Sequence, residues 1–405
     1  MAESGEWTDV LCMACPSSEC NFAPMRLKRR PMSDIDVKIK MKFCGICHTD
    51  LHTAAGHLST LGLTNYPCVP GHELAGVCVA VGSKVTKFKV GDAVGVGCMI
   101  DSCRTCKNCK AGLEQKCLGQ VGTYNAPKTL ERSESYPKGS RPLGGYTDIM
   151  ICQEDFCVVI PPTYPLECAG PIMCAGVTLY DPLMVNKAGP GTKVAIVGLG
   201  GLGLIGIKIA KALGCEILAV SSSEAKSAVA KSCGADNFVI AKKIVGSAHV
   251  GGYDLVLNTI PVEHDYTMYS KLVNKKGKQV ILGLNTALVA GIIADAVVGK
   301  GSRIAGSGIG SIAATQAVIN LCAMHDIKPE IKLIGVHEIN RVYEELDNAN
   351  ASAVRYVIDI GTLDEGAFET CKDLKPPKLQ PYAGMSLTDI VCAIGAVFCC
   401  CRPCC

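Results

Sequence analysis

Short apolar segments separated by glycine dominate the first hundred residues of the chain. Residues 36–41, Asp-Val-Lys-Ile-Lys-Met, alternate between polar and apolar side chains, the pattern of a strand with one buried face. Residues 76–82 and 90–95 are apolar and are punctuated by glycine. Since such short strands are typical of compact β structure, this region is predicted to form a barrel-like β domain.

The pattern changes at Lys193. Residues 193–197, Lys-Val-Ala-Ile-Val, form an apolar run of the buried parallel-strand type, and a glycine-rich loop and a helical segment to Leu213 follow it. Further strands are predicted downstream at 216–220, 255–258, 279–282 and 303–305. Strands that alternate with helical stretches predict a doubly wound α/β sheet. A helix at 341–348 and a strand at 354–360 are predicted to complete the fold.

The C-terminal segment has a different composition. Residues 372–381 contain three prolines and are predicted to be a spacer, and residues 385–398 are largely apolar. Fourteen residues are too few to span a bilayer, which needs about 20. Five cysteines follow within 399–405. Palmitoyl chains on these cysteines would make the segment a membrane anchor. Metal binding by the thiols, or a disordered tail without function, are the alternatives.

The overall composition is that of an ordinary globular protein. A length of 405 residues predicts two or three domains, and 48% hydrophobic with 19% charged residues provides an ample core. The net charge is only +3. Without a large basic excess, nothing in the composition favours nucleic acid as a partner.

Cysteine is unusually frequent, with 26 in the chain. The first ten residues carry acidic side chains and no apolar core segment, so they do not match a secretory signal, and a disulfide scaffold is not expected. Most cysteines outside the local clusters are expected to be reduced and buried. The Cys12 and Cys15 pair lacks a second pair and is a weak metal motif. The basic stretch Arg26–Arg30 is predicted to be a solvated strand edge.

Residues 43–52, Phe-Cys-Gly-Ile-Cys-His-Thr-Asp-Leu-His, hold a thiolate, two imidazoles, a hydroxyl and a carboxylate. A catalytic zinc takes three protein ligands and keeps one position open, and Cys47 is the first candidate ligand. His72 lies on the tight turn Pro-Gly-His-Glu, followed by Glu73 as a further carboxylate near the metal. Cys174, just before the nucleotide-binding region, is the candidate third ligand. The alternative is that these cysteines are buried small hydrophobes.

A second group of cysteines falls within fifteen residues. Two residues separate each of the first pairs and seven precede the last, giving Cys103, Cys106, Cys109 and Cys117. Four thiolates can close around one tetrahedral ion without an open position, which is the structural type of zinc site. The spacing therefore predicts a structural zinc. Cys98, five residues earlier, has no assigned role.

The loop after residue 197 has the glycine spacing of a dinucleotide-binding turn, with Gly198, Gly200, Gly201 and Gly203. Glycine lets the backbone approach a pyrophosphate, and the helix N-terminus presents free N–H groups to its charge. An NAD enzyme places an acidic residue at the end of the next strand, but this chain has Ser221, Ser222 and Ser223, with Lys226 following. Hydroxyls and a cation favour the 2′-phosphate of NADP(H). The alternative is that the serines cap a helix beginning near Glu224.

These motifs occur in one order: CGICHTDLH, GHE, four closely spaced cysteines and GLGGLG. Over residues 25–360 the chain resembles a zinc-dependent medium-chain alcohol dehydrogenase of the cinnamyl alcohol dehydrogenase-like branch. The resemblance implies a GroES-like β-rich catalytic domain, discontinuous over 1–178 and 315–360, and a doubly wound Rossmann cofactor domain over 179–314. Residues 361–405 form a Cys-rich C-terminal tail outside it. A homodimer in the cytoplasm is also implied, with the tail as a candidate membrane anchor.

The resemblance also implies the roles of individual residues. Two zinc ions and NADP(H) would be bound, and the catalytic zinc would polarise an aldehyde carbonyl. Thr49 would hydrogen-bond the substrate oxygen and pass protons through the cofactor ribose to His52, which exchanges with solvent. His48 and Thr178 would contact the cofactor, and Asp50 would orient His72.

The substrate is an aldehyde or alcohol whose identity the sequence leaves open. Cinnamyl-type enzymes carry aromatic residues that clasp a phenylpropenyl ring, but Gly122 and Gly308 stand at the matching places here. Three alternatives remain: an NAD-preferring alcohol dehydrogenase, a membrane-attached metal-binding protein with degenerate catalysis, and a zinc-free quinone reductase of the same superfamily. The complete set of ligand and relay residues argues against the last two.

Overall fold

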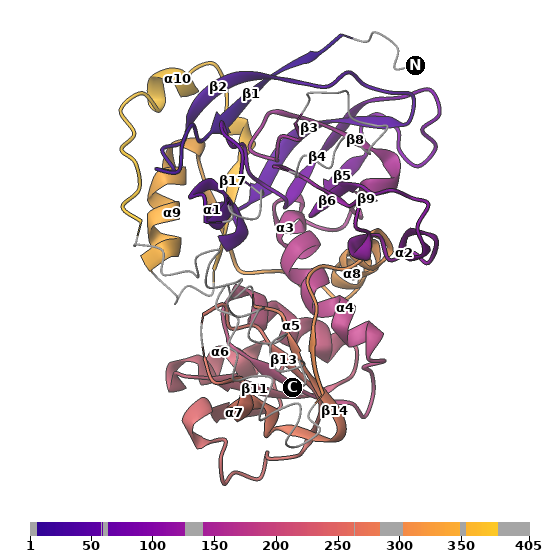
Figure 1. Cartoon of the computed structure of the whole chain (residues 1–405), viewed down its shortest axis with the longest axis vertical. Helices are drawn as coiled ribbons and strands as arrows, with labels where there is room; N and C mark the ends of the chain where they lie inside the picture. The colour runs from indigo at the N-terminus through magenta and orange to yellow at the C-terminus, as the bar shows by residue number, and fades with distance from the viewer. Residues whose placement is uncertain are drawn as a thin grey trace, which may run out of the picture. The chain divides into compact units, whose positions relative to one another are not determined.

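The computed structural model describes residues 6–57, 59, 64–125, 141–262, 264–283, 303–348 and 354–379. The chain divides into two compact units, which are Met1–Asp181 with Ile309–Gln380 and Pro182–Gly308 with Pro381–Cys405 (Figure 1). The apolar segment predicted at 385–398 and the terminal cysteines lie outside the described residues.

The first unit is built on a seven-stranded sheet whose longest strand is β3. β3 pairs antiparallel with β4, β8 and β17, so strands from both ends of the chain meet on it. The strands are β3 (Asp36–Gly45), β4 (Leu74–Val81), β5 (Ala93–Val96), β8 (Ile149–Gln153), β9 (Cys157–Val159), β16 (Ile331–Ile334) and β17 (Arg355–Asp359). β5 begins later than the segment predicted at 90–95, because Gly91 has φ +96° and lies in the turn before the strand.

An antiparallel hairpin at the N-terminus pairs β1 (Thr8–Ala14) with β2 (Ala23–Arg29). The prediction of a solvated edge over Arg26–Arg30 is wrong for its last two residues. Arg29 is buried and donates to the carbonyl oxygens of residues 143, 144 and 149, and Arg30 is buried in an ion pair with Asp36. A guanidinium carries five donors, so burial is tolerated where carbonyls and a carboxylate surround it.

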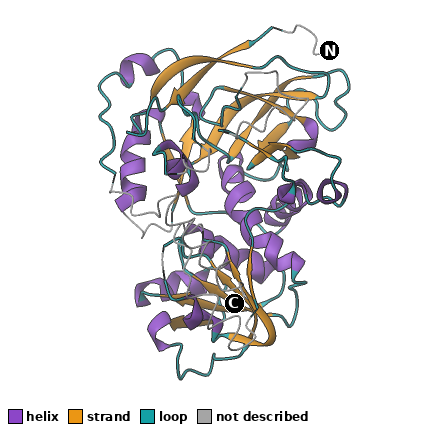
Figure 2. Cartoon of the chain, in the orientation of Figure 1, coloured by secondary structure: helices purple, strands orange, loops and turns teal. Residues whose placement is uncertain are grey.

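The first unit contains helices as well as strands, drawn in purple and orange in Figure 2. The helices are α1 (His48–Ala54), α2 (Lys107–Lys110), α3 (Leu166–Pro171), α4 (Val177–Val185, which continues into the second unit), α8 (Ile312–Met324), α9 (Ile339–Asn348) and α10 (Ala367–Thr370). A further small ladder joins β6 (Met99–Asp101) and β7 (Val121–Gly122). The stretch Leu166–Val185 is long and apolar enough to cross a membrane, but 72% of its most apolar window is buried inside the protein, as in a core helix.

The second unit contains a six-stranded sheet of parallel strands in the order β12-β11-β10-β13-β14-β15. This is the doubly wound order, with the first strand at the centre, and it confirms the predicted Rossmann arrangement. The strands are β10 (Lys193–Val197), β11 (Glu216–Ser221), β12 (Asn237–Ile240), β13 (Tyr253–Asn258), β14 (Val273–Ile281) and β15 (Ile304–Gly306). The described helices are α5 (Gly201–Ala212), α6 (Ser227–Ser232) and α7 (Tyr266–Ser270).

Residues 361–379 pack on the first unit, although the sequence suggested that a free tail begins there. Leu363, Ala367 and Cys371 belong to its hydrophobic core, and Leu374 and Leu379 pack against that core. The spacer predicted from the prolines is therefore anchored up to residue 379, because two leucines among them supply apolar surface to bury.

Candidate active site and metal centres

The first turn of α1 carries the residues at the centre of the opening motif. Cys47 is the N-cap of the helix, and its backbone N–H donates to Asp50 Oδ2 at 2.9 Å in a reciprocal capping box. This cap fixes the Cys47 side chain at the helix start. Thr49, on the same turn, places its hydroxyl 3.6 Å from the Cys47 sulfur.

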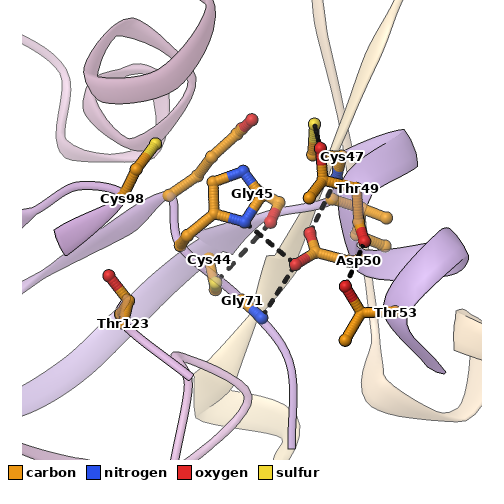
Figure 3. A network of polar contacts seen from close by, with 12 residues as sticks. Cys44, Gly45, Cys47, Thr49, Asp50, Thr53, Gly71, Cys98 and Thr123 are labelled. Atoms are coloured by element: carbon orange, nitrogen blue, oxygen red, sulfur yellow. Dashed lines mark hydrogen bonds and ion pairs between the residues drawn. The ribbon is translucent and has the colours of Figure 1, made fainter. Parts of the chain in front are cut away.

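Asp50 also connects this turn to the segment that carries His72. Its Oδ1 accepts from the backbone N–H of Gly71 at 3.0 Å (Figure 3). The same oxygen accepts from His72 Nδ1, also at 3.0 Å. A carboxylate only accepts, so His72 Nδ1 carries its proton and Nε2 remains for a metal. Gly71 has φ +104°, and a Cβ there would lie 2.8 Å from the Cys44 sulfur, so the turn that presents His72 requires glycine.

Cys174 lies in the π-helical turn Ile172–Gly176 between α3 and α4. Such turns inside helices are frequent at functional sites. The ligand atoms of Cys47, His72, Glu73 and Cys174 all lie within 4.8 Å of one another. Hydrogen bonding with Cys174 and His72 lowers the pKa of Cys47 well below its usual range in spite of burial, which favours the thiolate that a metal needs. The structure thus brings together the four residues predicted as the catalytic zinc site.

Glu73 is fully buried, and neither of its carboxylate oxygens has a hydrogen-bond partner among the described residues. Burial raises its pKa to about 7, although Arg355 opposes the shift from 3.5 Å away. Arg355 lies on β17, more than 280 residues from Glu73 in the sequence, and no local motif predicted this contact. An unsatisfied carboxylate beside two thiols and an imidazole fits a divalent cation.

Two further side chains border this group without having been predicted. Cys98 interacts with the Cys174 thiol, which lowers the pKa of Cys98, and its sulfur lies 3.9 Å from the Met173 carbonyl oxygen. The Tyr124 ring stacks on the His72 imidazole with centroids 5.9 Å apart. Only the tertiary structure reveals these neighbours, since neither residue has a ligand spacing.

The side chains of the second cysteine group lie close together in the loop around α2. The sulfurs of Cys103, Cys106, Cys109 and Cys117 lie within 4.8 Å of one another. Cys117 accepts backbone N–H bonds from Cys103 and Gly119, and Cys106 accepts one from Cys109. Similar backbone donors lower the pKa of Cys103 to about 6. Four cysteine sulfurs grouped in this way fit a tetrahedral zinc without an open position.

The glycine-rich loop joins β10 to α5 as the pattern predicted. Gly198 has φ +89°, and a Cβ there would lie 2.8 Å from the Thr259 hydroxyl. A Cβ at Gly203 would lie 1.9 Å from the Gly198 carbonyl oxygen, so close packing of helix on loop requires glycine. Gly200 has open space, and Gly201 begins α5. The loop therefore has the geometry that lets a pyrophosphate approach the backbone.

The serine-rich turn after β11 lies beside this loop. The ammonium of Lys226 donates to the Leu199 carbonyl oxygen at 2.8 Å, which links the turn to the glycine segment. Ser221 is buried, whereas Ser222 and Ser223 are exposed. Ser223 occupies the N-cap of the following short helix, but its side chain makes no capping bond. The Ser221 hydroxyl accepts from the Ser223 backbone N–H at 3.2 Å.

The remaining predicted residues have defined neighbours. His48 Nε2 lies 3.1 Å from the Leu346 carbonyl oxygen, and the Thr178 hydroxyl donates to the Cys174 carbonyl oxygen at 2.8 Å. His52 Nδ1 lies 3.0 Å from Nδ1 of His57, a residue that was not predicted. The signal that could have found His57 is the glycine before it, which ends α1.

Comparison with known proteins agrees with this geometry. Residues 33–162 match the family model of the alcohol dehydrogenase GroES-like domain, and residues 201–324 match that of the zinc-binding dehydrogenases. An NADP-dependent alcohol dehydrogenase C of Mycolicibacterium smegmatis is 42% identical over 364 residues, covering 87% of this chain and 99% of its own length. The chain belongs to the zinc-dependent medium-chain alcohol dehydrogenase family. It is therefore an oxidoreductase, and the resemblance inferred from the sequence is confirmed.

Other relatives of this alcohol dehydrogenase point to the same branch. An aldehyde reductase of Escherichia coli is 39% identical over 351 residues, covering 86% of this chain and 97% of its own. A cinnamyl alcohol dehydrogenase structure from Sorghum bicolor superposes with a TM-score of 0.79 at 35% identity, covering 87% and 98% of the two chains. One from Helicobacter pylori, complexed with NADP(H), gives 0.78 at 33% identity, covering 88% and 99%. The fold of a GroES-like domain with a Rossmann domain is confirmed.

Proposed function

We propose that this alcohol dehydrogenase uses NADPH and zinc to reduce aldehydes, and catalyses the reverse oxidation of alcohols. The observation that carries the proposal is the group of Cys47, His72 and Cys174. The buried Glu73 carboxylate lies beside it without a hydrogen-bond partner among the described residues. The names of the relatives, an NADP-dependent alcohol dehydrogenase and an aldehyde reductase, support both the cofactor and the reaction.

When bound, zinc would supply a Lewis acid for the substrate oxygen and NADPH the hydride. Cys47, His72 and Cys174 would hold the metal, with Glu73 as a further ligand or a partner for its water. Asp50 fixes His72 so that Nε2 is the atom offered to the metal. The Thr49 hydroxyl would hydrogen-bond the substrate oxygen, a role that its position 3.6 Å from the Cys47 sulfur supports. His52, at the other end of α1, would exchange the proton with solvent.

NADPH rather than NADH is favoured by the turn after β11. Two exposed serines, Ser222 and Ser223, and the ammonium of Lys226 are hydroxyl and cationic donors suited to a 2′-phosphate. The pyrophosphate would lie at the glycine loop and the N-terminus of α5. His48 and Thr178 are the proposed cofactor contacts in the first unit.

The substrate pocket is proposed to accept bulky or branched aldehydes. A Cβ at Gly122 would meet only the carbonyl oxygens of Tyr124 and Cys98, at 3.5 and 4.0 Å, and one at Gly308 would meet nothing within 4 Å. A Cβ is thus accommodated at Gly122, and Gly122→Trp should shift selectivity towards flat aromatic aldehydes. A strong preference of the unmodified enzyme for cinnamaldehydes would contradict an open pocket.

The deciding experiment measures zinc content together with NADPH and NADH oxidation over a panel of aldehydes. Two zinc ions per chain and turnover with NADPH are expected, and Cys47→Ser should abolish turnover while the protein stays folded. Cys78→Ser is the matched control, because this thiol is buried in β4 and contacts only the Ala80 carbonyl oxygen in the described hydrogen-bond network. A zinc-free or NADH-specific enzyme would contradict the proposal.

Two finer proposals rest on the sequence. The family resemblance supports a cytoplasmic location. It also supports a homodimer, which sedimentation analysis would test. The apolar residues 385–398 and the five cysteines after them support an acylated membrane anchor. Absence of hydroxylamine-sensitive acylation on the full chain would exclude that anchor.

A further inference from the structure

A second histidine, His57, contacts the His52 side chain. The Nδ1 atoms of His52 and His57 are 3.0 Å apart, and their ring centroids are separated by 5.3 Å at an interplanar angle of 49°. Both residues are half-buried. The distance is that of a hydrogen bond between two imidazoles.

The pairing follows from the way α1 ends. Gly56 has φ +76°, the His57 N–H donates to the His52 carbonyl oxygen, and the Gly56 N–H donates to the Thr53 carbonyl oxygen. These two bonds define a Schellman motif, which brings the side chain after the glycine against the side chain five residues earlier. An apolar contact usually fills that position. Here it is filled by two imidazoles, so the backbone itself sets the contact between them.

The charge environment keeps the pair neutral near pH 7. Burial, and the neighbouring His57 and His48 rings, lower the pKa of His52 to about 4, while Cys47 and Asp347 oppose the shift. Burial also lowers the pKa of His57, opposed by the Asp347 carboxylate of α9. Two neutral imidazoles joined through Nδ1 must be in opposite tautomers, since one nitrogen donates and the other accepts. Such a pair can pass a proton along the shared bond.

We propose that His57 transfers protons between solvent and His52 in the proton relay. This proposal rests on the proposed function. For aldehyde reduction the pair starts with a proton on His52 Nε2 and another on His57 Nδ1. His52 gives up its Nε2 proton towards the active site, and the His57 Nδ1 proton moves to His52 Nδ1. Water or a buffer acid then protonates His57 Nε2. One proton enters from solvent for each one delivered. Each ring returns to its starting tautomer by exchange with water, which takes the proton from one nitrogen and supplies one to the other. Alcohol oxidation runs the same steps in reverse.

The test compares His57→Gln and His57→Phe with the unmodified enzyme in alcohol oxidation. Glutamine retains a hydrogen-bonding group against His52 but cannot relay a proton, and phenylalanine retains only the ring volume. Stopped-flow measurement of NADPH formation and of proton release, with a pH indicator in weak buffer, follows both events. His337→Gln is the control, since this histidine is exposed in the same unit and lies outside the machinery.

Both variants should release the proton about tenfold more slowly, less than the ~100-fold effect of a group that transfers the proton directly. A concentrated buffer such as morpholinoethanesulfonate should restore the rate of NADPH formation in both variants. Their solvent isotope effect should rise, and the His337→Gln control should behave as the unmodified enzyme. Unchanged proton release, or a loss that is equal at every pH and is not restored by buffer, would overturn the proposal. If the unmodified enzyme oxidises no alcohol with NADP+, the proposed function fails instead.

Discussion

Replacing Asp50 by asparagine should weaken metal binding at the catalytic group without removing any ligand. Asp50 is fully buried and accepts three hydrogen bonds, at 2.9 Å from Cys47 N, 3.0 Å from Gly71 N and 3.0 Å from His72 Nδ1. These bonds tie the helix start, the glycine turn and the imidazole together. One carboxylate thus orients two of the proposed ligands, Cys47 and His72.

Asparagine can keep its oxygen towards Gly71 and His72, but its amide nitrogen then faces the Cys47 N–H, donor against donor. A hydrogen bond to a charged group contributes ~1.5–3 kcal/mol, so the variant should lose about 2 kcal/mol of stability. Loss of the carboxylate that orients a metal-binding histidine typically lowers metal affinity by ~10–100-fold, or about 1.4–2.8 kcal/mol.

The assay is competition for zinc by a chromophoric chelator, with the metal content measured at each chelator concentration. One zinc per chain should be removed at a lower chelator concentration in Asp50→Asn, while the ion held by the four cysteines stays bound. Asp148→Asn is the control, because Asp148 also accepts a backbone N–H bond, from Leu11, in the same unit. If Asp50→Asn holds both ions as tightly as the control, the argument that Asp50 orients His72 is refuted.

Four further predictions concern other parts of the chain. Cys109→Ser should lower zinc content to about one ion per chain and lower the melting temperature, and an unchanged zinc content would exclude a structural site. Ser222→Asp should raise the KM for NADPH and shift preference towards NADH by about tenfold or more, since each ~1.4 kcal/mol of charge repulsion is tenfold; an unmodified enzyme that already prefers NADH would contradict this. The pKa of His52 is lowered from 6.5 to about 4 on folding, so its contribution to stability is complete above pH 6.5 and is lost as pH falls to 4. As pH falls from 6.5 to 4, His52→Gln should therefore lose less free energy of unfolding than the unmodified enzyme. The difference in slope should be up to about 1.4 kcal/mol per pH unit, measured by denaturant unfolding at each pH. A chain ending at Gly361 should be less stable than one ending at Leu379 by about 2–5 kcal/mol or more, because it lacks the core residues that follow Gly361; equal melting of the two would refute the packing of 361–379.

The Rossmann unit was predictable because its signals are local. An apolar run, a glycine loop and a helical segment in succession specify strand, turn and helix through backbone preferences alone, and β10 begins and ends where the pattern placed it. Parallel order then follows from the connection rules for such units. The grouping of Cys103, Cys106, Cys109 and Cys117 was predictable for the same reason, since all four lie in one short loop.

The N-terminal hairpin and the segment 361–379 show where local patterns failed. The charge of Arg29 and Arg30 suggested solvent, but carbonyls from residues 143–149 and the Asp36 carboxylate satisfy their donors. The prolines after residue 372 suggested a free spacer, but Leu374 and Leu379 pack against the core of the first unit. In both cases burial depends on partners that lie far away in the sequence.

The sequence by itself determined the inventory of the active site: which residues can hold zinc, which loop can take a pyrophosphate, and where an acidic residue is missing. The tertiary structure decided how that inventory is supported, through Arg355 beside Glu73, Cys98 beside Cys174 and His57 beside His52. Spacing along a chain specifies side chains that share a turn, because backbone geometry alone relates them. Side chains on different elements meet only once the sheet has been assembled and the core has closed around them.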